Sequence, residues 1–201
     1  MNVGILGAGS IAKCMAAAIN GLDDSVKAYA VASRDINKAQ AFADEWGFEE
    51  AYGSYEDMLN DPKVDLVYVA TPHSYHLENS KLCIDHGKAV LCEKPFTVNA
   101  AQARELFDYA REKNVFITEA IWTRYMPSRS ILNETIASGI IGTPRMIVAD
   151  LSYPIENKNR MTDPNLAGGS LLDIGIYPIN FTSMVFGNDI RDISGSCTYT
   201  D

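Results

Sequence analysis

Three shortages in the sequence exclude whole classes of protein. The cysteines are few and widely scattered: Cys14, Cys83, Cys92 and Cys197. They have neither the paired spacing of a metal site nor that of a redox pair, so we expect reduced thiols in a cytoplasmic protein. No segment reaches the roughly 18 uninterrupted apolar residues that a membrane-spanning helix needs. The apolar start over residues 3–19 has no basic residues before it and contains Lys13, which argues against a signal peptide.

Positive charge is the third shortage. The chain has 17 lysines and arginines against 26 aspartates and glutamates, a formal net charge of -9, which argues against a nucleic-acid surface. Anionic ligands are not excluded, because a phosphate responds to nearby amides and cations. With 201 residues, 47% hydrophobic and 21% charged, the chain has the composition of one large or two small globular domains. We expect no nucleic-acid or membrane partner.

Apolar strands alternate with helical segments as far as residue 118. The strands are expected over residues 2–6, 26–32, 51–52, 65–70, 89–92 and 115–118. The helices are expected over residues 10–20, 36–46, 54–59, 75–86 and 100–113. This alternation predicts right-handed βαβ units and a parallel sheet covered on both faces. Residues 1–119 are therefore predicted to form an α/β domain of the doubly wound Rossmann class.

The regular alternation of strands and helices does not continue in residues 120–201. A helix over 128–138, a long strand over 144–153, a polar loop over 156–165, a helical stretch over 170–186 and a strand over 190–199 are expected. These elements are too few to close a mostly antiparallel sheet, so we expect the beginning of an incomplete α+β substrate domain. Apolar surface from Met146, Val148, Leu151 and the 171–186 helix would then be exposed, and self-association is expected.

The turn between the first strand and the first helix carries the strongest motif, Gly7-Ala8-Gly9-Ser10-Ile11-Ala12. Gly7 permits a tight turn, Gly9 lets a pyrophosphate approach the backbone, and Ala12 keeps the helix close to the sheet. The free amides at the helix start, at Ser10 and Ile11, would receive the phosphates. The position after a buried strand favours dinucleotide binding over a tight turn without a ligand.

The choice of cofactor is usually made about 20 residues further on, where an acidic side chain would bind the ribose of NAD. This chain has Ser33 and Arg34 there, which can bind a 2′-phosphate, and Lys38 one helical turn later. Asp35 is a contrary sign, and Arg34 could also be a solvated surface residue. We predict NADP as the cofactor, with NAD as the alternative.

Four further segments carry a family resemblance. They are residues 70–76 (ATPHSYH), 92–95 (CEKP), 119–124 (EAIWTR) and 168–178 (GGSLLDIGIYP). In this order, after the glycine turn, they resemble the glucose–fructose oxidoreductase, inositol dehydrogenase and rhizopine catabolism (Gfo/Idh/MocA) superfamily. Within it the chain looks most similar to the branch of dihydrodiol dehydrogenases and glucose–fructose oxidoreductases, which favours NADP.

The resemblance implies roles near the cofactor. It places Lys94, flanked by Glu93 and Pro95, beside the nicotinamide and the reacting carbinol, with a cis peptide bond before Pro95. It places Thr71 and Pro72 at the nicotinamide ribose.

By the same resemblance, His76 lies near this ribose pocket. Trp122 and Arg124 would lie next to the cofactor, where the chain crosses to the second domain. His73 and His76 without a third ligand are weak evidence for a metal, and none is expected.

The resemblance also brings Asp173 and Tyr177 to the substrate. Hydride transfer from an alcohol carbon needs a base for the hydroxyl proton. A nearby positive charge favours the deprotonated form of lysine and tyrosine, so Lys94 and Tyr177 can share a proton relay. From the residues alone, Asp173 could equally form a capping box with Ser170, and Tyr177 could be a core aromatic. Many relatives carry histidine where this chain has Tyr177.

Together these features predict an NADP-dependent oxidoreductase. It would transfer hydride between nicotinamide and a carbinol carbon of a sugar, polyol or vicinal diol, with Lys94, Tyr177 and Asp173 as catalytic residues. The full-length protein is expected to be a homodimer or a higher homo-oligomer. The alternative is a dinucleotide-sensing regulator or a non-catalytic binding protein of the same superfamily.

Overall fold

Six short apolar segments pair into one parallel sheet in the computed structural model, which describes residues 1–155 and 158–198. The strands are β1 (Asn2–Leu6), β2 (Lys27–Ala32), β3 (Glu50–Tyr52), β4 (Leu66–Val69), β5 (Ala89–Glu93) and β6 (Ile117–Ala120). Their order is β3-β2-β1-β4-β5-β6. The direction of winding reverses between β1 and β4, so the sheet is doubly wound and the predicted Rossmann fold is confirmed.

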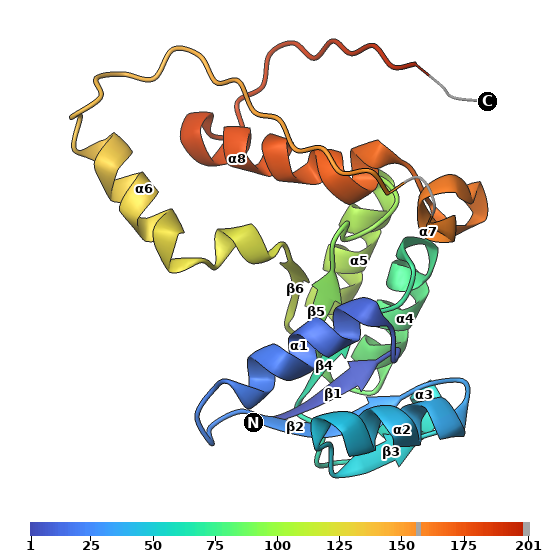
Figure 1. The fold of residues 1–201 in the computed structure, drawn as a ribbon. Helices are drawn as coiled ribbons and strands as arrows, with labels where there is room; N and C mark the ends of the chain where they lie inside the picture. Colours follow the sequence, from blue (N-terminus) through green and yellow to red (C-terminus); the bar gives the residue numbers. More distant parts are fainter. Residues whose placement is uncertain (156–157, 199–201) are drawn as a thin grey trace. The chain divides into compact units, whose positions relative to one another are not determined.

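Helices connect successive strands and cover both faces of the sheet (Figure 1). They are α1 (Ser10–Asn20), α2 (Ile36–Trp46), α3 (Tyr55–Leu59), α4 (His76–Asp85) and α5 (Ala100–Glu112). On one face, Ala16 of α1 and Phe42 of α2 pack in one buried cluster with Ile5. On the other face, Ile84 of α4 and Leu106 of α5 belong to a second cluster. Because both faces are covered, the central strands are apolar along their whole length.

The turn after β1 requires glycine at its first position. Gly7 has φ +104°, and a Cβ there would lie 3.0 Å from Ala70 O. The Gly7 amide donates to Ala32 O, and the Ala70 amide donates to Leu6 O, both at 2.9 Å. The turn is therefore held between β2 and β4, at the point where the strand order reverses.

In residues 1–120, two differences from the predicted elements go beyond shifts of a boundary by one residue. The last strand starts at Ile117 rather than at residue 115, because Val115 still bonds back to Ala110 O at the end of α5 and Asn114 has φ 55°. The helix predicted over 75–86 is a 3₁₀ turn, His73–Tyr75, followed by α4. In both places the chain turns beside the end of a regular element, and the turn includes residues that the sequence pattern assigned to that element.

The chain divides into two compact units. The first contains Met1–Ile121 with Ile155–Asp173, and the second contains Trp122–Pro154 with the residues from Ile174 onward. The short helix α7 (Asn159–Thr162) and a 3₁₀ turn at Pro164–Leu166 thus belong to the unit of the sheet. No helix among the described residues is long and apolar enough to cross a membrane.

The second unit contains two long helices, α6 (Pro127–Ala137) and α8 (Ile176–Phe186). The helix predicted over 170–186 is divided into a π-helical turn, Leu171–Gly175, and α8. Pro178 is tolerated because it lies in the first turn of α8, where its missing N–H costs no helical bond.

The strands predicted over 144–153 and 190–199 are wrong for the described residues, which are irregular from 144 to 153 and from 190 to 198, while residue 199 lies outside the described residues. A strand exists only where a neighbour accepts its backbone hydrogen bonds, and none of the described residues pairs with these segments. Met146 and Val148 are exposed.

An aspartate ties together the edge of the sheet that carries β2 and β3. Asp61 Oδ2 accepts from the hydroxyls of Tyr29 and Tyr52, both at 2.8 Å, and Oδ1 accepts from the Lys63 amide at 2.8 Å. Burial alone raises the pKa of the Asp61 carboxyl, but these hydrogen bonds outweigh it and hold the pKa below 3.8. Burial and the bond to Asp61 raise the pKa of Tyr29 to about 12.

We expect Asp61→Asn to lower the free energy of unfolding at pH 7 by about 1–2 kcal/mol, because two tyrosine hydroxyls lose a charged acceptor that is partly screened by water. A carboxyl with a lowered pKa stabilises the fold above its unfolded pKa and loses this effect as the pH falls through its folded pKa. The difference between the two proteins should therefore shrink below about pH 4. Urea unfolding at several pH values measures it, with the exposed Asp24→Asn as control. A difference that does not change with pH would contradict the assignment.

Candidate functional site

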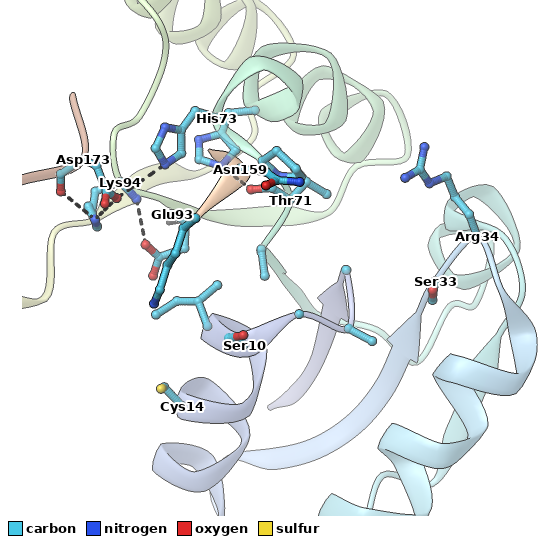
Figure 2. A pocket seen from close by; sticks show the side chains of 18 of the residues that line it. Ser10, Cys14, Ser33, Arg34, Thr71, His73, Glu93, Lys94, Asn159 and Asp173 are labelled. Atoms are coloured by element: carbon cyan, nitrogen blue, oxygen red, sulfur yellow. Dashed lines mark hydrogen bonds and ion pairs between the residues drawn. The ribbon is translucent and has the colours of Figure 1, made fainter. Parts of the chain in front are cut away.

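A pocket of about 700 Å³ lies against the loops at the carboxyl ends of the strands (Figure 2). It includes thirteen of the residues predicted from the sequence: Gly7, Gly9, Ser10, Ile11, Ser33, Arg34, Lys38, Thr71, Pro72, His76, Glu93, Lys94 and Asp173. All of them belong to the first unit. The volume lies within the range of about 300–1,000 Å³ that is usual for small-molecule and cofactor sites.

Helix α1 begins at this pocket without a side-chain cap. Its N-cap is Gly9, no side chain bonds to its first amides, and its first turn carries no acidic residue. A Cβ at Gly9 would meet no atom within 4 Å, so the space beside this residue is open. Ala12 is completely buried below the turn. The helix start therefore offers amides and a positive dipole end to an anion.

The side chains of the loop after β2 fall into two groups: one caps helix α2, and the others line the pocket. Asp35 caps α2, with its Oδ1 accepting from the Asn37 amide at 2.9 Å. Ser33, Arg34 and Lys38 line the pocket, and Arg34 lies at the end of the pocket opposite Lys94 in Figure 2. The acidic side chain is thus engaged by the backbone, and the hydroxyl and the cations line the pocket.

His76 joins two of the loops that form the pocket. Its Nδ1 lies 2.8 Å from Pro95 O, its Nε2 lies 2.9 Å from Thr71 O, and the ring is completely buried. Burial lowers the pKa of His76 to about 4, so a neutral imidazole donates its one N–H to one of the two carbonyls. The Lys94–Pro95 bond is cis, as expected. His76 therefore shapes the pocket by holding the backbone at Thr71 and at Pro95 in place.

Glu93 is buried beside Lys94 and accepts hydrogen bonds on both oxygens. One oxygen accepts from the Tyr68 hydroxyl, and Oε2 accepts from the Lys94 amide at 3.0 Å. Burial raises the pKa of Glu93, and these hydrogen bonds oppose that shift. On the other side of the Pro95 loop, Glu119 Oε1 accepts from the Phe96 amide at 2.8 Å. The backbone on both sides of the cis bond is thus fixed by carboxylates.

Lys94 and Asp173 form a buried ion pair. Lys94 Nζ donates to Asp173 Oδ1 at 2.9 Å and to Asp173 O at 2.8 Å, and the two side chains are 13% and 4% exposed. His73 Nε2 lies 3.7 Å from the same Oδ1, and His73 Nδ1 lies 3.1 Å from Ala167 O. Figure 2 shows this group at one end of the pocket. It places a cation, a carboxylate and an imidazole together, which is a set capable of proton transfer.

The remaining predicted residues form a cluster in the second unit. Trp122 Nε1 donates to the Tyr177 hydroxyl at 2.9 Å, and the two rings meet edge to face. With its amide oriented by its partners, Asn180 Oδ1 accepts from Arg124 Nε at 2.7 Å and from Nη2 at 3.0 Å. Tyr177 and Asn180 are three residues apart on α8, so they share a helix face.

Several residues of the site were not predicted from the sequence. Tyr68 could have been noticed as a hydroxyl in the apolar strand LVYV, since a buried hydroxyl needs a partner. Cys14, in α1, could have been noticed one turn after Ser10. No sequence feature pointed to Lys158 and Asn159 as residues of the pocket, because they were expected to lie in a polar loop.

Comparisons with known proteins give the chain a family. Residues 1–120 match the family model described as "Oxidoreductase family, NAD-binding Rossmann fold", and residues 131–201 match the model described as "GFO/IDH/MocA C-terminal domain". The first match alone covers more than half of the chain.

Two curated relatives and one solved structure agree with this. The chain is 45% identical over 185 residues to trans-1,2-dihydrobenzene-1,2-diol dehydrogenase of Mus musculus, which covers 92% of this chain and 56% of that protein. It is 43% identical over 199 residues to D-xylose 1-dehydrogenase (NADP(+)) of Hypocrea jecorina, which covers 89% and 51%. A 3-ketoreductase from Actinomadura kijaniata, solved in complex with NADP and TDP-benzene, aligns with a TM-score of 0.85 at 30% identity and covers 93% and 57%.

The chain thus spans about half the length of the relatives that it matches. Both family models match it in the expected order, and the motif segments 70–76 and 92–95 lie at one pocket of a doubly wound sheet. The chain belongs to the GFO/IDH/MocA family of oxidoreductases with an NAD-binding Rossmann fold.

Proposed function

We propose that this chain is the cofactor-binding and catalytic part of an NADP-dependent oxidoreductase acting on a sugar, a polyol or a vicinal diol. The observation that carries the proposal is the buried Lys94–Asp173 pair at one end of a pocket whose other end is lined by Arg34. One end supplies groups for proton transfer, and the other supplies a cation for a phosphate. An elongated ligand with a phosphate at one end and a reacting ring at the other fits this arrangement.

The residues present fit a dinucleotide. The uncapped start of α1 and the open space at Gly9 suit a pyrophosphate, because backbone amides can approach it there without a side chain in between. Ser33, Arg34 and Lys38 would hold a 2′-phosphate, while Asp35 is engaged in capping α2 and would not bind the ribose. Thr71 and Pro72 would form the wall at the nicotinamide ribose.

The proposed chemistry divides between the cofactor and the chain. A nicotinamide dinucleotide supplies the hydride acceptor or donor when bound. Lys94 would take the proton from the substrate hydroxyl, or return it in the reverse direction, and Asp173 would hold the Lys94 amine in place through two contacts. Glu93 would fix the Lys94 backbone through its amide. Tyr177 would share the proton, oriented by the hydrogen bond from Trp122.

The substrate class follows from chemistry and from relatives. A carbinol carbon carries the hydrogen that leaves as hydride and the hydroxyl that loses its proton, so sugars, polyols and vicinal diols all qualify. The names of the two relatives specify a cyclic diol and D-xylose. We use these two compounds as probes, because they cover both kinds of substrate.

The proposal has further parts. Residues 1–119 would form the dinucleotide-binding domain, and residues 120–201 would belong to the substrate domain. Trp122 and Arg124 would contribute to the cofactor site from the second unit. The whole protein would be a cytoplasmic homo-oligomer.

We expect the chain to bind NADPH more tightly than NADH, and Arg34→Ala to remove this preference. The variant should lose about tenfold or more in affinity for NADPH, since a charge-assisted bond to a phosphate contributes about 1.5–3 kcal/mol. Its affinity for NADH should change little. Titration followed by cofactor fluorescence measures both. A wild type that prefers NADH would show that the loop after β2 recognises a ribose instead.

The two glycines of the turn should behave differently. Gly7→Ala should lower the melting temperature, because a Cβ at φ +104° is strained by roughly 1–2 kcal/mol and would also lie 3.0 Å from Ala70 O. Gly9→Ala should fold normally, since Gly9 has φ -96° and its Cβ would meet no protein atom. Gly9→Ala should nevertheless weaken binding of both dinucleotides. Unchanged binding by a folded Gly9→Ala variant would exclude a pyrophosphate at this turn.

Substitution of Lys94 should separate turnover from binding. We expect Lys94→Met to lower kcat by about 10²- to 10⁴-fold, the usual contribution of a positioned acid or base, and to spare NADPH binding. Lys94→Gln is the matched control for folding, because its amide can still donate to Asp173 but cannot transfer a proton. Oxidation of trans-1,2-dihydrobenzene-1,2-diol and of D-xylose with NADP measures turnover.

The outcomes for Lys94 distinguish an enzyme from a sensor. Turnover retained in both variants would exclude Lys94 as the proton-transfer group. A wild type that binds NADPH tightly but oxidises neither probe would favour the dinucleotide-sensing alternative. A wild type that binds neither dinucleotide would overturn the proposed function.

A further inference from the structure

Lys158 and Asn159, at the start of α7, line the same pocket, although they lie more than thirty residues after the last strand of the sheet, β6. They belong to residues 155–173, which group with the sheet unit and not with the residues on either side of them. Resting on the proposed function, we propose that Lys158 is a further binding residue for the cofactor and contacts its pyrophosphate.

The position of the segment is fixed by contacts at two places. Ala167 O lies 3.1 Å from His73 Nδ1, which anchors the segment to the turn that follows β4. Asp173, at its end, forms the buried pair with Lys94. Before these places, Lys158 O accepts from the Met161 amide at 2.7 Å, and Asp163 Oδ1 accepts from the Asn165 amide at 2.9 Å, so the chain leading to Ala167 forms local hydrogen-bonded turns.

The anchor places the segment at the middle of the pocket. Gly7 and Thr71 are neighbours, since a Cβ at Gly7 would lie 3.4 Å from Thr71 Cγ2. In Figure 2, Arg34 and Lys94 lie at opposite ends of the pocket, and Asn159 lies between them in this view. Lys158 directly precedes Asn159 and lines the same pocket as the glycine turn.

The charges of the lining favour a role for this cation. The lining includes four cationic side chains: Arg34, Lys38, Lys94 and Lys158. Arg34 and Lys38 belong to the end expected to hold the 2′-phosphate, and Lys94 is paired with Asp173. The glycine turn itself offers backbone amides and the Ser10 hydroxyl, but no cation, to a doubly charged pyrophosphate. Lys158 supplies the cation for that part of the ligand, as a flexible point charge that suits a phosphate without fixed geometry.

The test compares NADPH and NADH, which share the pyrophosphate and differ at the 2′-position. Lys158→Gln should weaken binding of both dinucleotides by the same factor, about three- to tenfold at low ionic strength, and the effect should shrink with added salt. Lys158→Arg should retain most of the affinity. Lys27→Gln is the matched control, because Lys27 is an exposed lysine at the amino end of β2, away from the carboxyl ends that carry the pocket.

Cofactor fluorescence and the shift in melting temperature on adding each dinucleotide are the readouts, so the test does not depend on turnover. A loss confined to NADPH would assign Lys158 to the 2′-phosphate and overturn the proposal. Equal affinities of wild type and Lys158→Gln would overturn it while leaving the proposed function intact. If wild type binds neither dinucleotide, the proposed function and this inference are both wrong.

Discussion

The close approach of Gly7 to Ala70 is the constraint on which the rest of the pocket depends. These residues directly follow β1 and β4, the two strands between which the winding of the sheet reverses. A side chain at Gly7 would push the two loops apart, since its Cβ would lie 3.0 Å from a backbone oxygen. Without one, α1 starts directly above the sheet edge and the loop after β4 lies beside it. The pocket is the space that these two loops share with the loops after β2 and β5.

The Lys94–Asp173 pair adds the part of the site that the sheet alone cannot provide. A buried ion pair gains little net stability, because removing both charges from water costs about as much as their attraction returns. The Lys94–Asp173 pair is important here because it fixes the positions of two chain segments. It joins β5 to a segment 79 residues later, and the His73–Ala167 contact holds the same segment at a second place. A lysine fixed by a carboxylate and a carbonyl is presented to the pocket in one orientation, which a proton-transferring group requires.

The sequence predicted best those features whose causes are local. The extents of β1, α1 and α2 follow from runs of apolar residues ended by glycine and from a cap such as Asp35, so their bounds agree with the structure. The strands expected over 144–153 and 190–199 were wrong, because β-branched and aromatic content cannot show whether a neighbouring strand exists. The roles of the site residues stay predictions, although the pocket brings thirteen of them together. Lys158 could not be found, since only the fold returns its segment to the sheet.

The start of helix α2 links the stability of the fold to the choice of cofactor. A helix leaves its first amides without partners, and a side chain such as aspartate at the cap satisfies one of them. Asp35 does this for α2 with its Oδ1, and Asp35 is not among the described residues that line the pocket. Arg34 and Ser33, one and two residues before the cap, line the pocket instead. The proposed preference for a 2′-phosphate would thus depend on which side chain caps the helix as well as on the presence of an arginine.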